Sequence, residues 1–304
     1  MPSRARKASL VALVALAAAS GLVLSSCGQD RIEPADARAQ AIEDGKRIDD
    51  TAEPGTGTGS GTDNATTGTG TGTGTTGAPA TTPRGGARSL PLGQLPLNQI
   101  PVDCEKAKCI ALTFDAGPGK DTPQLLDTLR REKVPATFFL LGKNHVIKYP
   151  SVVKRIFTEG HEVANHTWSH PRLDKLKPAE IREELSRTQD AIAKITGEKP
   201  TLMRPPQGRI NDDVTAVSKE LGLAQILWSA TAKDYSTTDS DLIRERIVKQ
   251  ASKDGIILLH DIYDGTVPAV PGIISELKER GYTFVTVSQL LAPAKAEPGA
   301  IYKP

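Results

Sequence analysis

Beyond Leu90 the sequence alternates short apolar runs with amphipathic segments, and this alternation limits the possible folds more than any other feature. Seven apolar runs have the composition of strands, at residues 109–114, 136–141, 162–165, 201–204, 225–229, 256–260 and 283–287. Between them lie six segments with helical periodicity, at residues 122–132, 151–159, 178–196, 212–221, 239–252 and 270–280. A regular alternation of strands and helices predicts a parallel sheet, here a closed or nearly closed barrel. About 190 residues is short for eight strand–helix units, so we expect fewer units or an open side.

Several of the predicted helices have recognisable ends. Asp121, Asn211 and Thr238 stand where N-caps are expected, because their side-chain oxygens can accept hydrogen bonds from the first free N–H groups of a helix. Glycines follow five of the helices and predict where they end: Gly160, Gly197, Gly222, Gly255 and Gly281.

The first 26 residues have the organisation of a secretory signal. Basic residues at positions 4, 6 and 7 precede an apolar stretch over residues 10–24. The stretch ends in Leu24-Ser25-Ser26-Cys27, which resembles the bacterial lipobox, where the Cys is lipidated and becomes the new N-terminus. We therefore expect an exported lipoprotein held by Cys27 at the outer face of the cytoplasmic membrane. The alternatives are an ordinary signal peptide with an incidental Cys, or a short membrane helix, for which the apolar run is short.

Residues 27–100 have the composition of a linker. The part from Thr51 to Ala87 is rich in Gly and Thr and has too little apolar surface to offset the entropy of ordering it, so we expect disorder. A flexible tether of roughly 50 residues reaches on the order of 40 Å. The chain thus divides into a signal over 1–26, this tether, a folded domain over 101–292 and a tail over 293–304.

The net charge of +2 comes without a basic stripe interleaved with aromatic residues, which argues against a nucleic-acid partner.

The cysteines give more information about the compartment in which the protein works. If Cys27 carries lipid, Cys104 and Cys109 remain as an even pair in an exported protein, and we expect them to form a disulfide. The alternative is a pair of free thiols. The sequence does not indicate the oligomeric state, and we assume a monomer.

Five polar residues stand at the ends of predicted strands or in the loops after them. They are Asp115, Arg204 and His260, which end the first, fourth and sixth strands, and His166 and Asp234, which follow the third and fifth. Functional side chains of a β/α barrel come from these positions, so we expect the five to converge on one rim. A satisfied core histidine is the usual alternative for a single His, but it does not explain the whole set.

His166 and His170 lie four residues apart, a spacing that can aim both imidazoles at one metal ion. A pair of loop histidines hydrogen-bonded to the backbone is the alternative. Asp115 supplies a carboxylate that can act as a base at the same rim. Together these residues predict a metal-dependent hydrolase with an Asp base.

Five ordered motifs lie between about Lys108 and Leu291. They are Thr113-Phe114-Asp115-Ala116-Gly117, His166-x3-His170, Arg204-Pro205-Pro206-Gln207-Gly208, Asp234-Tyr235 and Leu258-Leu259-His260. In this order they resemble the motifs of the NodB-homology polysaccharide deacetylases, carbohydrate esterase family 4. The resemblance implies a distorted (β/α)7 barrel that removes acetyl groups from amino sugars.

The resemblance also implies the roles of the residues on the base side of the site. His166 and His170 would bind a divalent metal, zinc or else cobalt or nickel, which polarises the acetyl carbonyl and acidifies a water. Asp115 would be the general base that takes the proton of this water. Arg204 would keep Asp115 ionised and oriented.

On the acid side, His260 would protonate the leaving amine, and Asp234 would hold His260 in the protonated state. The backbone N–H of Gln207 would donate to the oxyanion. Tyr235 and Leu258 would line the pocket for the acetyl methyl group.

Ala116 departs from the family pattern, in which two adjacent Asp residues serve as base and metal ligand. The loss of one anionic ligand predicts weaker metal binding. Water, substrate oxygens or a nearby carboxylate such as Asp174 can fill the gap, or Asp115 itself can bind the metal. The third outcome is a metal-poor site on a protein that only binds glycan. The other motif residues favour a working enzyme, although Thr231 stands where many relatives carry a further acidic residue.

We therefore expect an N-deacetylase that acts on acetylated polysaccharide of the cell envelope, namely on N-acetylglucosamine or N-acetylmuramic acid units of peptidoglycan. A lipid anchor and a long tether fit a substrate close to the membrane. An O-acetyl xylan esterase or a chitin-oligomer deacetylase would use the same site. The rival class is a catalytically weakened glycan-binding lipoprotein.

Overall fold

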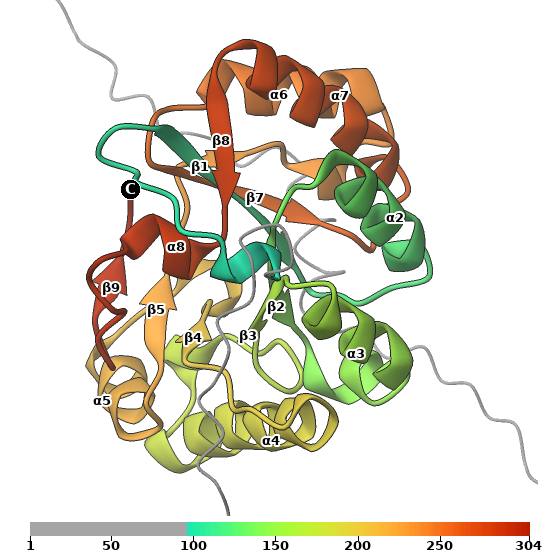
Figure 1. The fold of residues 1–304 in the computed structure, drawn as a ribbon. Helices are drawn as coiled ribbons and strands as arrows, with labels where there is room; N and C mark the ends of the chain where they lie inside the picture. The colour runs from blue at the N-terminus through green and yellow to red at the C-terminus, as the bar shows by residue number, and fades with distance from the viewer. Residues whose placement is uncertain (1–95) are drawn as a thin grey trace, which may run out of the picture.

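The computed structural model of the protein describes residues 96–304. Figure 1 shows a single sheet of strands with helices packed around its outside. The predicted signal over residues 1–26, Cys27 and the predicted tether up to residue 95 lie outside the described residues. Within residues 96–304, none of the helices is both long and apolar enough to cross a membrane.

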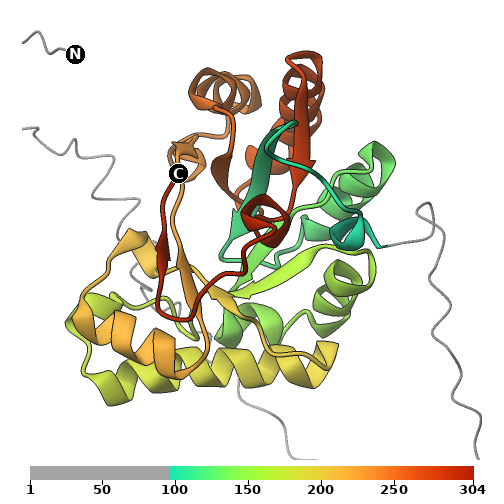
Figure 2. The same cartoon turned by 60° about the vertical axis from the view of Figure 1, so that its left-hand side comes forward.

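The neighbouring strands of the sheet run parallel, as the sequence predicts. The strands are β1 (Lys108–Asp115), β2 (Thr137–Leu140), β3 (Glu162–Asn165), β4 (Leu202–Met203), β5 (Ala224–Ile226), β6 (Ala230–Thr231), β7 (Gly255–His260), β8 (Tyr282–Val285) and β9 (Ile301–Tyr302). They follow the order β6-β7-β1-β2-β3-β4-β5-β9, and β8 joins β1 outside this path. The expected distorted (β/α)7 barrel is confirmed as a curled parallel sheet whose described end strands, β6 and β9, do not pair (Figure 2).

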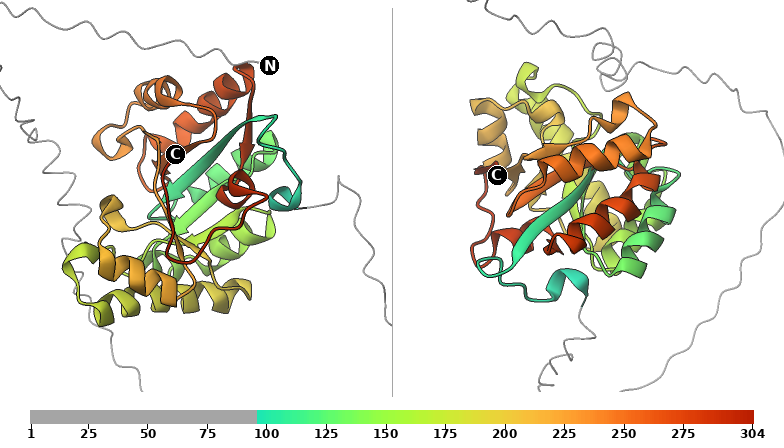
Figure 3. Two further views of the ribbon diagram at one scale, coloured as in Figure 1. Left: turned by 90° about the vertical axis from the view of Figure 1, so that its left-hand side faces the viewer. Right: turned by 90° about the horizontal axis from the view of Figure 1, so that it is seen from above.

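Helices cover the outer side of the curl (Figure 3). The α-helices of the described region are α2 (Thr122–Glu132), α3 (Pro150–Thr158), α4 (Pro178–Thr196), α5 (Asp212–Glu220), α6 (Ser240–Gln250), α7 (Thr266–Glu279) and α8 (Val287–Leu291). Short helical turns complete the chain: η2 (Leu97–Gln99), η3 (Gly142–Val146), η4 (Leu173–Lys175), η5 (Pro206–Gly208) and η6 (Asp234–Ser236).

β1 is the central strand, and its side chains alternate between two environments. Ile110, Leu112 and Phe114 belong to the apolar core that the sheet shares with its helices. Because successive strand residues point to opposite faces, Thr113 and Asp115 point toward the inside of the curl. The C-terminal end of β1 pairs with β2 on one side and with β7 on the other. This register places Asp115 directly beside His260 of β7.

The structure differs from the sequence-based prediction at a few short elements. β6 and β9 were not expected, and β9 lies in the predicted tail over residues 293–304, where it pairs with β5. Each of these two strands has two residues, too few to show a strand period. α7 begins at Thr266 instead of residue 270, since the region 266–271 contains two prolines that disfavour a helix prediction.

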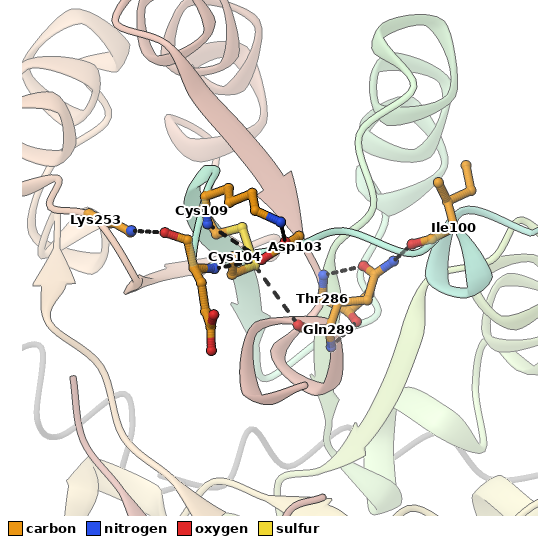
Figure 4. Close-up of a disulfide and its surroundings, with 9 residues drawn as sticks. Ile100, Asp103, Cys104, Cys109, Lys253, Thr286 and Gln289 are labelled. Carbon is orange, nitrogen blue, oxygen red and sulfur yellow. Dashed lines mark hydrogen bonds and ion pairs between the residues drawn. A yellow bond between two sulfur atoms is a disulfide. The ribbon is translucent and has the colours of Figure 1, made fainter. Parts of the chain in front are cut away.

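The segment before β1, residues 96–107, is fixed to the barrel and is called the N-terminal strap below. Cys104 and Cys109 are joined by a disulfide, which ties the strap to the first strand (Figure 4). Gln289 of α8 donates from Nε2 to two carbonyl oxygens of the strap, at 3.0 and 2.9 Å. The strap is therefore held at both of its ends.

Candidate active site

A cavity of about 200 Å³ lies at the C-terminal ends of the strands. It is lined by Asp115, His166, His170, Pro205, Gln207, Trp228, Thr231, Lys233, Tyr235, Leu258 and His260. The two remaining residues that the sequence predicts for the site, Arg204 and Asp234, are buried behind this lining and bond to it. The structure thus brings all the predicted catalytic, metal-binding and substrate-binding residues together.

Asp115 is held by Arg204, which is fully buried. The Arg204 Nη1 group donates to Asp115 Oδ1 at 2.7 Å and to Thr113 Oγ1 at 2.7 Å, while Nε donates to the carbonyl of Ile226 at 3.1 Å. Burial raises the pKa of Asp115, and the charge of Arg204 and its hydrogen bond oppose that rise. This arrangement fixes Oδ1 and orients the other oxygen, Oδ2, toward His166.

The two predicted metal-binding histidines lie side by side, with their ring centroids 4.9 Å apart. His166 Nδ1 is 2.9 Å from the carbonyl oxygen of Arg204, so Nδ1 is the donor and Nε2 carries a lone pair. Burial holds the pKa of His166 well below its usual value, which keeps the ring neutral. Nε2 lies 3.8 Å from Asp115 Oδ2, and two acceptor atoms this close favour a cation or a hydrogen-bond donor between them.

These donors fit a divalent ion held by two imidazoles, with Asp115 Oδ2 close by. No group of three or more His, Cys, Asp or Glu side chains in residues 96–304 is arranged to hold a metal. Ala116 contributes no carboxylate. Asp174 does not line the cavity and instead accepts two hydrogen bonds from Arg172, at 3.1 and 2.7 Å.

His260 also lines the cavity, and Asp234 lies buried behind it. Asp234 Oδ1 lies 2.9 Å from His260 Nδ1, and Oδ2 accepts from the backbone N–H of His260 at 2.7 Å and from Thr266 Oγ1 at 2.7 Å. Burial acts to raise the pKa of Asp234, but the charge of His260 and these hydrogen bonds outweigh it and hold the pKa below its usual value. An ionised Asp234 favours the protonated form of His260. Thr266 was not predicted, because a threonine in the first turn of a helix carries no distinguishing signal.

Two tyrosines flank His260. The ring of Tyr263 lies 5.4 Å from the imidazole and the ring of Tyr235 lies 6.2 Å from it, both in edge-to-face geometry. Tyr263 was not predicted, and neither was Trp228, which stands in the irregular segment between β5 and β6. Tyr235 and Tyr263 thus enclose the imidazole of His260 from two sides.

Several non-glycine residues around the cavity have left-handed backbone angles. They are Ala116, Thr167, His170, Gln207 and Lys233, with φ between 48° and 73°. Such conformations cost roughly 1 to 3 kcal/mol each and concentrate at functional sites, where the surrounding structure holds them in place. The clustering marks this rim of the sheet as the functional one.

Comparison with known proteins agrees with this geometry. Residues 103–226 match the family model described as polysaccharide deacetylase. The chain is 41% identical over 184 residues to the peptidoglycan-N-acetylglucosamine deacetylase PgdA of Listeria monocytogenes, which covers 60% of this chain and 39% of that one. It is 44% identical over 184 residues to the peptidoglycan-N-acetylmuramic acid deacetylase PdaC of Bacillus subtilis, covering 60% and 38%. The match thus spans about two fifths of the length of these two relatives.

A solved structure gives a match over nearly the whole of its chain. The structure of T48 deacetylase with substrate is 40% identical to this protein, with a TM-score of 0.63, and the match covers 66% of this chain and 99% of that one. The fold, the residues of the site and the sequence comparison therefore indicate the same family. The chain belongs to the polysaccharide deacetylase family of NodB homology, carbohydrate esterase family 4.

Proposed function

We propose that this protein is a metal-dependent hydrolase that removes N-acetyl groups from amino sugars of peptidoglycan. One observation carries the proposal: a carboxylate–guanidinium pair and a carboxylate–imidazole pair face one cavity that also holds two further imidazoles. Glycan binding alone requires neither pair. The names of the relatives PgdA and PdaC support peptidoglycan as the substrate.

In this proposal Asp115 is the base. A zinc ion, or a cobalt or nickel ion, held by His166 and His170 would supply Lewis acidity and lower the pKa of a water. Asp115 Oδ2 takes the proton of the attacking water, while Arg204 holds Oδ1 and stabilises the carboxylate. The backbone N–H of Gln207 donates to the oxyanion that forms on the acetyl carbonyl oxygen.

His260 is the acid. The contact with Asp234 occupies His260 Nδ1, so Nε2 is the nitrogen that would deliver a proton to the leaving amine. Leu258 and Tyr235 line the same cavity and would enclose the acetyl methyl group. Because Asp115 and His260 sit in register on adjacent strands, base and acid can act on one amide from neighbouring positions.

We further propose that the protein is an exported lipoprotein that works at the outer face of the cytoplasmic membrane as a monomer. The sequence at Leu24 to Cys27 supports the lipid anchor. The disulfide between Cys104 and Cys109 supports export, because disulfides persist in oxidising compartments.

Acetate release from purified peptidoglycan and from chitin oligomers tests the enzyme, with zinc, cobalt and nickel each added. Asp115→Asn and His260→Ala are expected to lose activity by at least about a hundredfold. Asp213→Asn, an exposed carboxylate on α5, is the matched control and should retain it. If no metal restores acetate release from any acetylated glycan, acetylxylan included, the protein is a glycan-binding member of its family instead.

A further inference from the structure

Lys233 is the one residue with a permanent positive charge among those that line the cavity. Its backbone has a left-handed conformation, with φ of 48°, and the side chain is exposed at the cavity wall. This conformation is held locally: the backbone N–H of Lys233 donates to Thr231 Oγ1 at 3.3 Å, and its carbonyl accepts from Ser236 N at 2.9 Å and Oγ at 2.7 Å. These hydrogen bonds fix the backbone of Lys233 and therefore the position from which its side chain extends.

Among residues 96–304, the ammonium group of Lys233 has no protein counter-ion. Within residues 96–304, Lys233 takes part in hydrogen bonds through its backbone, and its Nζ forms no ion pair. The lining contains one carboxylate, Asp115, and Arg204 already neutralises it at 2.7 Å. Asp234, behind the lining, is likewise engaged with His260. The cavity therefore presents an unbalanced positive charge next to its acid.

We propose that Lys233 determines substrate specificity by binding a carboxylate on the glycan, which makes acidic N-acetylated glycan the preferred substrate class. This inference rests on the proposed deacetylase function. In peptidoglycan the carboxylate has two sources: the lactyl group of N-acetylmuramic acid, where no peptide is attached, and the stem peptide. An ammonium that is already beside the cavity pairs with either one without displacing a protein partner. A neutral N-acetylglucosamine oligomer offers no such group.

The test compares kcat/KM for three soluble substrates: a chitin oligomer, peptidoglycan fragments stripped of their stem peptides by an amidase, and the same fragments with the stems attached. Lys233→Gln is expected to lower the ratio of kcat/KM on acidic glycan to that on the chitin oligomer about tenfold, mainly through KM. Lys233→Arg should keep this ratio high. Added salt should reduce the preference of the wild type more than that of Lys233→Gln. The acidic fragment on which Lys233→Gln causes the larger loss of kcat/KM shows whether Lys233 binds the lactyl carboxylate or a stem-peptide carboxylate.

Lys143→Gln is the matched control, since Lys143 is exposed on η3 and does not line the cavity. Loss of activity by Lys233→Gln to the same extent on all three substrates would overturn the proposal and assign Lys233 to the stability of its loop. An unchanged ratio would also overturn it. If the wild type releases no acetate at all, the proposed function fails. In that case calorimetry measures how wild type and Lys233→Gln bind the stem-free fragments and the chitin oligomer. A preference of wild type for the stem-free fragments that Lys233→Gln lacks supports the specificity, and equal binding by the two proteins contradicts it.

Discussion

Arg204 illustrates how single residues hold the site together. Its guanidinium is fully buried, and three of its nitrogens donate to Thr113, Asp115 and the carbonyls of Ile226 and Leu227. The group also lies 4.1 Å from the centre of the Phe139 ring. The planar guanidinium of an arginine can donate to all of these acceptors at once, whereas the ammonium group of a lysine cannot. Arg204 therefore connects the base on β1 with the C-terminal end of β5.

Replacing Arg204 with Lys is expected to lower the free energy of unfolding by about 3 kcal/mol, because it leaves buried acceptors and the Asp115 carboxylate without their donors. Acetate release should fall about a hundredfold under conditions where the variant stays folded. Urea denaturation and initial rates measure the two effects. Arg187→Lys, at an exposed arginine that stacks on Trp168, is the control and should change stability by less than about 0.5 kcal/mol. A stable and active Arg204→Lys variant would contradict this role.

Asp261 is a buried acid outside the proposed chemistry. Its Oδ2 accepts from Thr122 Oγ1, its Oδ1 accepts no hydrogen bond from a described residue, and burial raises its pKa to about 6. Since this folded-state pKa lies above the unfolded value of 3.8, the stability that Asp261 contributes is complete below pH 3.8 and is lost as the pH rises through 6.

Asp261→Asn cannot ionise, so its free energy of unfolding relative to wild type is expected to increase between pH 4.5 and 7.5, by about 2 kcal/mol. Urea titrations at several pH values measure this difference. Asp264→Asn, at an exposed carboxylate three residues further on, should show no comparable pH dependence. A difference that stays constant with pH would show that Asp261 is ionised in the folded protein throughout this range.

Ala116 has φ of 63°, a conformation that Asp and Asn tolerate better than Ala does. Restoring the carboxylate of the family motif with Ala116→Asp is expected to raise zinc affinity by at least about tenfold, because it adds an anionic ligand. Ala116→Asn is the matched control, since it shares the backbone preference without the charge. Calorimetric zinc titration of the three proteins measures the effect. Equal affinities for Ala116→Asp and wild type would mean that residue 116 does not face the metal.

Residues of the site differ in how far the sequence predicts them. Asp115, Arg204 and His260 each end a run of apolar residues, and that position in a parallel sheet is enough to bring them together. Thr266 and Lys233 stand in a helix start and a loop, where neither periodicity nor residue type marks them. Their places depend on packing between elements, which one sequence does not encode in a local pattern.

At the scale of elements, long periodic segments are predicted well and short ones poorly. The sequence predicts α2 and α4 with the bounds that the structure shows. Asn211 caps α5 as expected, through a hydrogen bond to its side chain from Val214 N at 2.9 Å. At α6, however, the cap is Asp239 and not Thr238, since two capping residue types stand next to each other and local chemistry does not choose between them. The two-residue strands β6 and β9 are defined only by their pairing with β7 and β5, and no local pattern in the sequence predicts them.

The N-terminal strap is the element whose stability depends most on a covalent link. Removing the disulfide with Cys104→Ala and Cys109→Ala is expected to lower the free energy of unfolding by about 2 kcal/mol, because the closed loop is short. Thermal unfolding, with and without a reductant, measures the loss, and hydrogen exchange should show faster opening over the strap. Zinc affinity should stay unchanged, since the strap does not line the cavity. A variant as stable as wild type would show that the Gln289 hydrogen bonds suffice.

At the scale of the whole molecule, the start of the N-terminal strap and the cavity lie at opposite ends of β3. Asn98 of the strap donates from its backbone N–H to the carbonyl of Gly160 at 3.1 Å, just before β3 begins. His166 stands just after the same strand ends. The chain therefore enters the barrel at the N-terminal end of β3, while the cavity lies at the C-terminal end. If the chain is anchored through the proposed lipid on Cys27, this arrangement would direct the cavity away from the membrane surface.

This separation predicts that anchoring and chemistry can be altered independently. Cys27→Ser in the full chain is expected to shift the protein from the membrane fraction to the soluble fraction, because the proposed lipidated thiol is lost. Its kcat/KM on soluble peptidoglycan fragments should stay within about twofold of wild type, since the lining of the cavity comes from residues 115–260. Activity on intact cell wall should fall, because the tether no longer concentrates the enzyme there. Fractionation and acetate release measure these effects, and Cys27→Ser protein that stays in the membrane fraction would show that the anchor lies elsewhere.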